Sequence, residues 1–330
     1  MDLSVKDLNK VYRVPIRKSG LAAAVKSIFK PQFSEVKAVD HISFEMKSGE
    51  AVGFIGPNGA GKTTTLKMLS GLMVPTSGKI SAGGFTPCER KPEYLRRISM
   101  LMGNKSQLTW DNTVLDSFEI LRDIYHISAK DYRERLDELV ALLEIEDHLS
   151  KLARNLSLGE RAKCEFAAAL LHRPDILYLD EPTLGLDVSM QFKLRRFIKD
   201  YNTRLGTTII LTSHYMSDIT SLCERVILIH EGKLLFDGAL NYLAEKIAPY
   251  KLVKITLGED FDRDGVTDEL SAVGEVIESE GMDFTLRLKK QDILSVTNFL
   301  IGRFKLSDLS LEDPPIEAVI DKVYREGISV

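Results

Sequence analysis

The sequence is poor in cysteine and contains no long apolar run. Its three cysteines, Cys88, Cys164 and Cys223, are far apart and show no C-x-x-C spacing. Neither a disulfide framework nor a zinc site is therefore expected. No apolar run approaches the ~18 residues that a membrane-spanning helix needs, and the first residues lack the apolar core of a signal peptide. We expect a cytosolic chain.

Neither sign of charge dominates the sequence. The formal net charge is −4, and residues 251–330 hold 17 acidic and 10 basic side chains, a balance of −7. The remaining 31 acids and 34 bases leave residues 1–250 with a balance of +3. A nucleic-acid-binding protein usually presents a strongly basic face. We therefore expect no nucleic-acid partner.

A glycine-rich loop lies between a predicted strand, Ala51–Ile55, and a predicted helix that extends to Ser70. The loop residues are Gly56, Pro57, Asn58, Gly59, Ala60, Gly61, Lys62, Thr63 and Thr64. Their spacing fits the G-x-x-x-x-G-K-[ST] phosphate loop, whose backbone N–H groups and helix N-terminus hold an anion. Lys62 would reach the β- and γ-phosphates, and the Thr63 hydroxyl would hold Mg²⁺. The alternative is a glycine-rich turn that happens to contain a lysine, which the flanking strand and helix disfavour.

Strands and helices alternate through much of residues 1–245. Strand-like runs at 175–179, 207–212 and 225–229, with a helix at about 190–205, predict a parallel sheet covered by helices. Short strands are expected at 3–5 and 42–45, before the phosphate loop. Residues from about 85 to 172 are predicted to be mainly helical. The sequence therefore predicts an α/β domain over residues 1–245, with an α-helical subdomain at about 85–172.

The composition changes near Ala248–Tyr250, where a second domain is predicted. Its expected strands are 252–257, 275–280 and 284–288, and its expected helices include 292–303 and 316–325. This order indicates a small β-α-β-β-α domain over residues 246–330, with a ferredoxin-like arrangement as the suggested topology.

A basic segment with no acidic residue runs from Arg13 to Lys30. Its basic residues are Arg13, Arg17, Lys18, Lys26 and Lys30. Its apolar residues, at positions 21, 22, 25, 28 and 29, suit one face of a helix. Such a helix would lie on anionic lipid or on a partner, or it would pack on its own domain. The sequence leaves both alternatives open, and with them the role of residues 13–35.

Two adjacent acids follow the apolar run Ile176–Leu179. They would stand at the carboxyl end of a buried strand, where parallel α/β sheets bind their ligands. Asp180 is suited to the Mg²⁺ shell, and Glu181 to polarising the attacking water as general base. A strand end that merely faces solvent is the alternative, which the upstream phosphate loop disfavours.

With the phosphate loop, four further motifs make residues 1–245 resemble the ATP-binding subunit of ABC transporters. They are Leu156-Ser-Leu-Gly-Glu160, Asp180-Glu181-Pro182-Thr183, Gly185-Leu186-Asp187 and Thr212-Ser213-His214. The similarity is greatest to exporter-type subunits that pair with ABC-2-like permeases, including the viologen or multidrug exporter branch. It implies a P-loop NTPase fold with a RecA-like parallel-sheet core, an antiparallel β-subdomain and a helical subdomain.

The resemblance also implies cofactors and partners. The cofactors would be ATP and Mg²⁺, and the chain would form a head-to-tail homodimer. It would lie peripherally on the cytoplasmic face of the cell membrane, bound to a separate integral membrane permease. The transported substrate is not indicated, because in this family the permease largely selects it.

The resemblance assigns roles to several residues. Lys62, Glu181 and His214 would be catalytic, with His214 as the switch histidine that contacts the γ-phosphate. Ser157, Gly159 and Glu160 of one chain would touch the γ-phosphate bound by the other, and Asp187 would bridge the two sites. Leu158 and Glu160 depart from the family's usual LSGGQ string. Ser157 and Glu160 also form a capping-box pattern, and Asp187 could be a plain helix N-cap; these simpler roles remain alternatives.

Four further residues have alternative roles. Tyr12 stands where the family places an aromatic that stacks on adenine, although packing within the β-subdomain is the alternative. The family's glutamine that reaches Mg²⁺ and the permease falls in register at Asn104, a metal and nucleotide candidate. Gln107, three residues later, is the other candidate. Trp110 would meet the partner or anchor the core.

Two other functions are considered beside the transporter subunit, and one of them is a rival. A soluble ABC ATPase that acts on nucleic acid or ribosomes usually carries long coiled-coil insertions or two nucleotide domains, and this sequence has neither. A regulatory role for the acidic C-terminal domain is compatible with transport.

Overall fold

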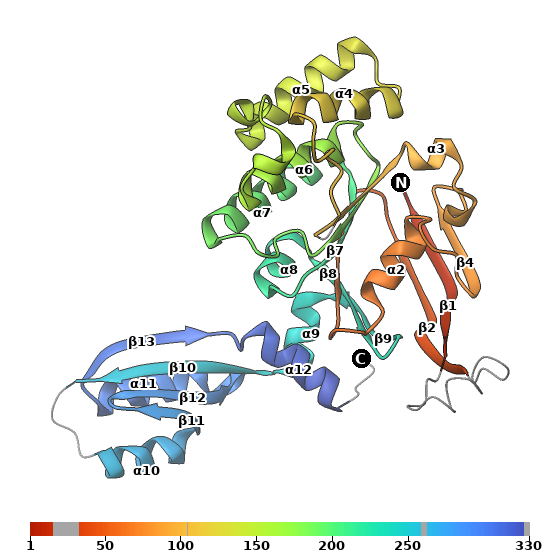
Figure 1. Cartoon of the computed structure of the whole chain (residues 1–330). Helices are drawn as coiled ribbons and strands as arrows, with labels where there is room; N and C mark the ends of the chain where they lie inside the picture. Colours follow the sequence, from red (N-terminus) through yellow and green to blue (C-terminus); the bar gives the residue numbers. More distant parts are fainter. Residues whose placement is uncertain (16–32, 104, 259–262, 327–330) are drawn as a thin grey trace, which may run out of the picture. The chain divides into compact units, whose positions relative to one another are not determined.

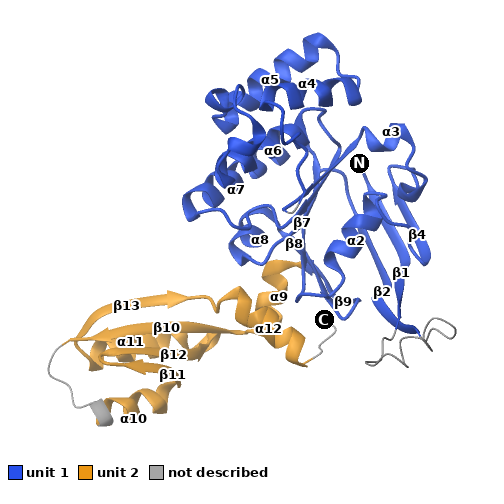
Figure 2. Ribbon diagram, in the orientation of Figure 1, with its two compact units in different colours: residues 1–238 blue, residues 239–330 orange. Residues whose placement is uncertain are grey.

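The computed structural model describes residues 1–15, 33–103, 105–258 and 263–326. The chain divides into two compact units, residues 1–238 and 239–330 (Figure 2). The sequence predicts the domain boundary at 245/246, whereas helix α9 (Leu240–Ile247) groups with unit 2. Its apolar side packs against α12 (Ile316–Glu326) of the same unit.

Unit 1 contains a parallel sheet, a smaller antiparallel sheet and a group of helices (Figure 1). Its strands are β1 (Leu3–Pro15), β2 (Phe33–Met46), β3 (Ala51–Ile55), β4 (Ser77–Ala82), β5 (Ile98–Met102), β6 (Ile176–Asp180), β7 (Thr208–Thr212), β8 (Arg225–His230) and β9 (Lys233–Ala239). Its helices are α2 (Lys62–Leu69), α3 (Pro92–Leu95), α4 (Val114–Ile124), α5 (Ala129–Leu143), α6 (Leu158–Leu170), α7 (Val188–Leu205) and α8 (Met216–Leu222).

The six-stranded sheet has the order β5-β6-β7-β3-β8-β9, and its pairs from β5 to β8 are parallel. Strands β6, β7 and β8 are apolar and buried along most of their length, as expected for a parallel sheet covered on both faces. The antiparallel sheet has the order β2-β1-β4. The predicted fold class is confirmed.

One buried cluster joins the two sheets of unit 1. Helix α2 contributes Leu66, Met68 and Leu69 to it, each with no exposed surface. Residues from β1 and β2 belong to the same cluster, as do residues from β3 and β6 to β8. The helix that follows the phosphate loop is therefore held firmly in the core, and its N-terminus has little freedom to move relative to the parallel sheet.

The strand register brings separate motifs to one edge of the parallel sheet. Asp180, the last residue of β6, lies opposite Met102 of β5 and Thr212 of β7. Thr212 in turn lies opposite Phe54 of β3, one residue from the end of that strand. The carboxyl ends of three neighbouring strands thus converge, as they do at ligand sites of open α/β sheets.

Some sequence expectations for unit 1 differ from the structure. The segment 85–172 contains α3 to α6, but Ile98–Met102 forms strand β5 of the parallel sheet. Its buried side chains pair with β6, a long-range contact that local periodicity does not reveal. Strands β1 and β2 are much longer than the predicted 3–5 and 42–45. Arg13–Pro15 of the basic segment belong to β1, and the positions of the predicted helix face, 21–29, lie among residues 16–32, outside the described residues.

Unit 2 contains a four-stranded antiparallel sheet in the order β11-β12-β10-β13. Besides α9 and α12, its elements are β10 (Tyr250–Leu257), α10 (Arg263–Val273), β11 (Glu275–Glu280), β12 (Asp283–Lys289), α11 (Ile293–Arg303) and β13 (Leu306–Glu312). The order β-α-β-β-α-β is ferredoxin-like. Strand β13 is absent from the sequence-based prediction, because its apolar residues do not alternate regularly; four of its seven residues are exposed and none is fully buried.

Candidate functional site

The phosphate loop joins β3 to α2 and depends on two glycines. Gly61 has φ +108°, and a Cβ there would lie 2.3 Å from the Ala38 carbonyl oxygen. A Cβ on Gly56 would lie 2.3 Å from the Ile229 carbonyl oxygen. Only glycine fits these positions, so the loop passes close to neighbouring backbone before α2 begins at Lys62. This local structure leaves the first N–H groups of α2 available at the loop, as anion binding requires.

The Lys62 side chain folds back over its own loop. Its Nζ donates to the carbonyl oxygens of Gly56 at 2.6 Å and Pro57 at 3.2 Å. Burial lowers the pKa of Lys62, while the nearby carboxylates of Glu181 and Asp180 oppose that change. The ammonium group is thus held at the loop by two neutral carbonyl oxygens, and a negatively charged phosphate oxygen would be a stronger acceptor.

Thr63 and Asp180 lie in direct contact, as the sequence-based roles require. The Thr63 hydroxyl is 3.0 Å from Asp180 Oδ2 and 3.1 Å from Oδ1. The Thr212 hydroxyl donates to Asp180 Oδ1 at 2.7 Å. These oxygens come from α2, β6 and β7, and oxygen ligands are what Mg²⁺ prefers. Thr212 was not among the predicted site residues, although its position directly before Ser213 and His214 was a usable signal.

Glu181 and His214 form the next contact along this edge. The backbone N–H of His214 donates to Glu181 Oε2 at 3.0 Å, and His214 Nε2 lies 3.5 Å from Oε1. Burial raises the pKa of Glu181, against the opposing effects of the His214 N–H, the His214 ring and Lys62. Glu181 also has φ +56°, a left-handed conformation that is uncommon outside glycine. Such strain is typical of functional positions.

The Ser157–Glu160 segment forms the predicted capping box at the start of α6. Ser157 N–H donates to Glu160 Oε2 at 2.8 Å, and Glu160 N–H donates to Ser157 Oγ at 3.3 Å. Lys151 Nζ lies 2.8 Å from Glu160 Oε1 and, with the Ser157 bonds, lowers the pKa of Glu160 to about 2. Asp187 likewise caps α7, because its Oδ1 accepts from the Met190 N–H at 2.9 Å.

Both cap motifs line one surface pocket. The pocket is bordered by Ser157, Gly159, Glu160 and Asp187, together with His148, Leu158, Lys163, Gly185, Leu186 and Met190. None of the residues of the 56–64 loop is among these lining residues. Within one chain this pocket therefore brings the Ser157–Glu160 segment and Asp187 together without the phosphate loop.

The remaining candidates have different surroundings. The Tyr12 hydroxyl, on β1, contacts Met73 Sδ at 3.1 Å, and Lys10 Nζ lies 5.5 Å from the ring centroid. Gln107 turns its amide towards the body, donating to the Met100 carbonyl oxygen at 3.3 Å. Asn104 lies outside the described residues. Trp110 is 53% exposed, so its interpretation as a core anchor is wrong.

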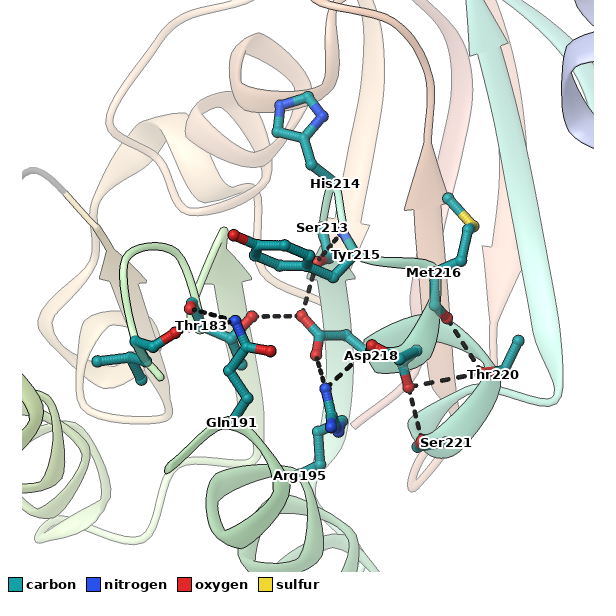
Figure 3. A network of polar contacts seen from close by, with 12 residues as sticks. Thr183, Gln191, Arg195, Ser213, His214, Tyr215, Met216, Asp218, Thr220 and Ser221 are labelled. Atoms are coloured by element: carbon teal, nitrogen blue, oxygen red, sulfur yellow. Dashed lines mark hydrogen bonds and ion pairs between the residues drawn. The ribbon is translucent and has the colours of Figure 1, made fainter. Parts of the chain in front are cut away.

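A buried polar network contacts residues that follow Glu181 and precede His214 in the sequence, and it was not predicted. It centres on Asp218, which is fully buried and receives the hydroxyls of Thr183 and Ser213 (Figure 3). An acid within a short helix after His214 gave no distinctive pattern by itself. Its partners are 5 and 35 residues away, so only the fold brings them together.

Family models match both parts of the chain. A model described as "ABC transporter" matches residues 39–184, and one described as "EvrA-like ABC transporter, C-terminal domain" matches residues 249–312.

Similar proteins match 66% to 76% of the chain. The chain is 35% identical over 217 residues to the ABC transporter ATP-binding protein NatA of Bacillus subtilis, covering 66% of this chain and 88% of that protein. It is 37% identical to the bacitracin transport ATP-binding protein BcrA of Bacillus licheniformis, over 66% of this chain and 70% of that protein. A Nod factor export ATP-binding protein I of Burkholderia orbicola is 32% identical, covering 76% of this chain and 81% of that protein.

Solved structures agree in fold. An ATP-binding subunit of an ABC transporter superposes with a TM-score of 0.62 and 26% identity, covering 74% of this chain and 93% of that one. A dimeric ATP-binding cassette bound to ADP and Pi superposes with a TM-score of 0.59 and 24% identity, covering 72% of this chain and 98% of that one.

Proposed function

Because the chain belongs to the family of ABC transporter ATP-binding proteins, we propose that it hydrolyses ATP to drive export through a separate membrane permease. The observation that carries this proposal is the convergence at one sheet edge of the Thr63–Asp180 and Glu181–His214 contacts. These pairs adjoin the phosphate loop. They supply the parts that phosphoryl transfer to water needs: a phosphate cradle, metal ligands and a base.

ATP would bind with its phosphates on residues 56–64 and with Lys62 on the β- and γ-phosphates. Thr63 and Asp180 would hold Mg²⁺, which supplies charge neutralisation of the phosphates when bound. Tyr12 would stack on the adenine. Either Asn104 or Gln107 would complete the contacts near the γ-phosphate; the inward-turned amide of Gln107 requires a loop shift for that role.

Glu181 is the proposed general base. It would accept a proton from the attacking water, and its raised pKa improves its ability to accept one while burial keeps bulk water away. His214 would contact the γ-phosphate and hold the Glu181 carboxylate, which it already approaches through its backbone N–H.

A second copy of the chain would complete each site. Ser157, Gly159 and Glu160 of one copy would then meet the phosphate bound by the other, with Asp187 between the two sites. The pocket that these four residues share within one chain is not lined by the phosphate loop, which supports this arrangement. Exposed apolar side chains near Asp187, at Val188 and Phe192, supply surface that dimerisation would cover.

The chain would lie peripherally on the cytoplasmic face of the cell membrane. Among the helices in the described part of the chain, none combines the length and apolarity that crossing a bilayer demands. A pocket between the sheet edge and the helical subdomain is lined by Trp110, Leu158, Arg161, Phe166 and Leu184, among others. We assign this pocket to docking of a short helix of the permease, close to the predicted 104–111 loop.

The rival function, an ABC ATPase acting on nucleic acid or ribosomes, is not favoured. The matched proteins named above are transport or export subunits. The weak positive balance of residues 1–250 also offers little attraction for a polyanion. The C-terminal unit is a candidate for regulation.

Glu181→Gln and Lys62→Ala test the proposed site. The glutamine removes the base but no phosphate contact, so ATP binding should persist while hydrolysis nearly stops and a dimer accumulates. The alanine should weaken ATP binding itself. Nucleotide affinity, ATPase rate and oligomeric state measured on the same preparations check both expectations. Near-normal turnover by the Glu181→Gln variant, or equal ATP affinity in the two variants, would contradict the assignment.

A further inference from the structure

A buried carboxylate joins the segment after Glu181 to the segment before His214. Asp218, on α8, has no exposed surface. Its Oδ2 accepts from the Thr183 hydroxyl at 2.5 Å and from the Ser213 hydroxyl at 2.6 Å. Thr183 lies two residues after Glu181, and Ser213 lies one residue before His214. Figure 3 shows the two hydroxyls meeting on the same carboxylate.

The other oxygen of Asp218 is paired with a cation. Arg195 of α7 donates from Nη1 to Asp218 Oδ1 at 3.0 Å and to Ser217 Oγ at the same distance. A buried charge is costly unless paired and hydrogen-bonded, and here donors from three separate segments satisfy it. Removing one donor therefore affects the position of the others.

Gln191 adds two hydrogen bonds to the segment between Thr183 and Asp187. Gln191 Nε2, one turn before Arg195 on α7, donates to the carbonyl oxygens of Thr183 at 3.4 Å and Leu186 at 3.2 Å (Figure 3). Helix α7 thus holds the backbone between Glu181 and Asp187 from one side. Asp218 holds the Thr183 side chain of the same segment.

We propose that Asp218 is a positioning residue for ATP hydrolysis: it fixes the Glu181 segment against the His214 segment so that the two side chains stay in contact. The inference rests on the proposed function of Glu181 as base. Neither Thr183 nor Asp218 needs to touch nucleotide for this role. Their loss should slow the chemical step without weakening ATP binding, because catalysis is sensitive to misplacement on the order of 1 Å.

Thr183→Val tests the inference with little change in side-chain shape. It removes one hydroxyl donor to Asp218, and we expect kcat to fall about tenfold or more while KM for ATP and the ADP affinity stay unchanged. Thr183→Ser restores the hydroxyl and should recover most of kcat. Ser213→Ala removes the other hydroxyl and should reproduce the loss, so a folding defect in one variant leaves the test intact.

A matched control separates positioning from general stability. Asp237→Asn breaks a partly buried ion pair in which Asp237 Oδ1 lies 2.6 Å from Arg225 Nε. Arg225 is the first residue of β8, so this pair lies at the amino end of the strand, opposite to the proposed site. The substitution should lower thermal stability and leave kcat unchanged. An equal loss of kcat in the Asp237→Asn variant would overturn the inference.

The Glu181→Gln background shows whether Asp218 acts through the base. In that background Thr183→Val should have no further effect on the residual rate, because coupled residues are not additive. If wild-type protein hydrolyses ATP and Glu181→Gln stops it, yet Thr183→Val keeps wild-type kcat, the Asp218 inference alone fails. If Glu181→Gln leaves turnover intact, the proposed function fails and the inference with it.

Discussion

His172 is a buried histidine whose surroundings oppose protonation. Its Nε2 donates to the Ile98 carbonyl oxygen at 2.9 Å, and its ring stacks on Tyr125 with centroids 3.8 Å apart. Within the described residues its buried Nδ1 has no hydrogen-bond partner. Burial lowers the pKa of His172 to about 4, with nearby Arg135 acting in the same direction. The folded protein therefore holds the ring neutral under conditions in which the unfolded chain protonates it.

This shift predicts a loss of stability in mild acid. Between pH 6.5, the ordinary histidine value, and pH 4 the unfolded chain binds more protons, so the free energy of unfolding falls as pH falls. His172 contributes a slope of up to about 1.4 kcal/mol per pH unit. His172→Gln, whose amide can still donate to Ile98, should flatten the dependence. Urea denaturation at several pH values above 5, where Glu160 stays ionised, measures the slope; identical slopes would contradict the expectation.

Two helices of unit 1 begin with the same side-chain arrangement. At α4, Thr113 N–H donates to Asp116 Oδ2 at 3.2 Å and Thr113 Oγ1 accepts from Asp116 N–H at 3.1 Å. At α6, Ser157 and Glu160 form the equivalent pair. For the Thr113–Asp116 capping box, stabilising the start of α4 is the whole proposed role. For the Ser157–Glu160 capping box, we also propose that Ser157 contacts the phosphate of a nucleotide bound by another copy.

The paired variants Thr113→Ala and Ser157→Ala separate these roles. Each should lower the free energy of unfolding by about 1 kcal/mol, the usual cost of losing an N-cap side chain. Only Ser157→Ala should also reduce the ATPase rate, because only Ser157 is proposed to contact phosphate. Denaturation curves and steady-state turnover check both. Equal turnover in the two variants would leave the capping box as the sole role of Ser157.

The division into two units leads to a prediction for the whole molecule. Every residue proposed to bind or hydrolyse ATP precedes Gly238, the last residue of unit 1. A truncated chain that ends there should fold and bind ATP with wild-type affinity. Its dimerisation or regulation should change. Circular dichroism and nucleotide titration check this, and a folded truncation that fails to bind ATP would show that the site depends on unit 2.

Recruitment to the membrane should depend on the pocket assigned to permease docking. Arg161 lies over the exposed Trp110 ring, 5.8 Å from its centroid, at the rim of the proposed docking pocket. Trp110→Ala should weaken binding to permease-containing vesicles and leave ATP affinity unchanged. Ile124→Ala, which also removes exposed apolar surface but lies outside the pocket, is the matched control. Tight binding of wild-type chain to anionic vesicles without permease would contradict docking; it would instead favour the basic 13–30 segment.

Local patterns in the sequence were sufficient to predict much of the fold class and the family. The phosphate loop, the two acids after Ile176–Leu179 and the Ser157–Glu160 segment are short, contiguous signals. Each depends on interactions between residues near in sequence: a tight turn that needs glycine, a buried apolar run, a helix cap. Such signals are readable because their physical cause is local.

Only the tertiary structure decided which of these motifs meet. Parallel pairing of β6 with β7 sets Asp180 opposite Thr212, and the same pairing brings Glu181 beside His214. Strand β5 was likewise missed, because its partner β6 is distant in sequence. The burial of Asp218 shows the reason most clearly. An isolated acid in a short helix has no pattern of its own, and its hydroxyl and guanidinium partners are supplied by segments that only the folded sheet brings together.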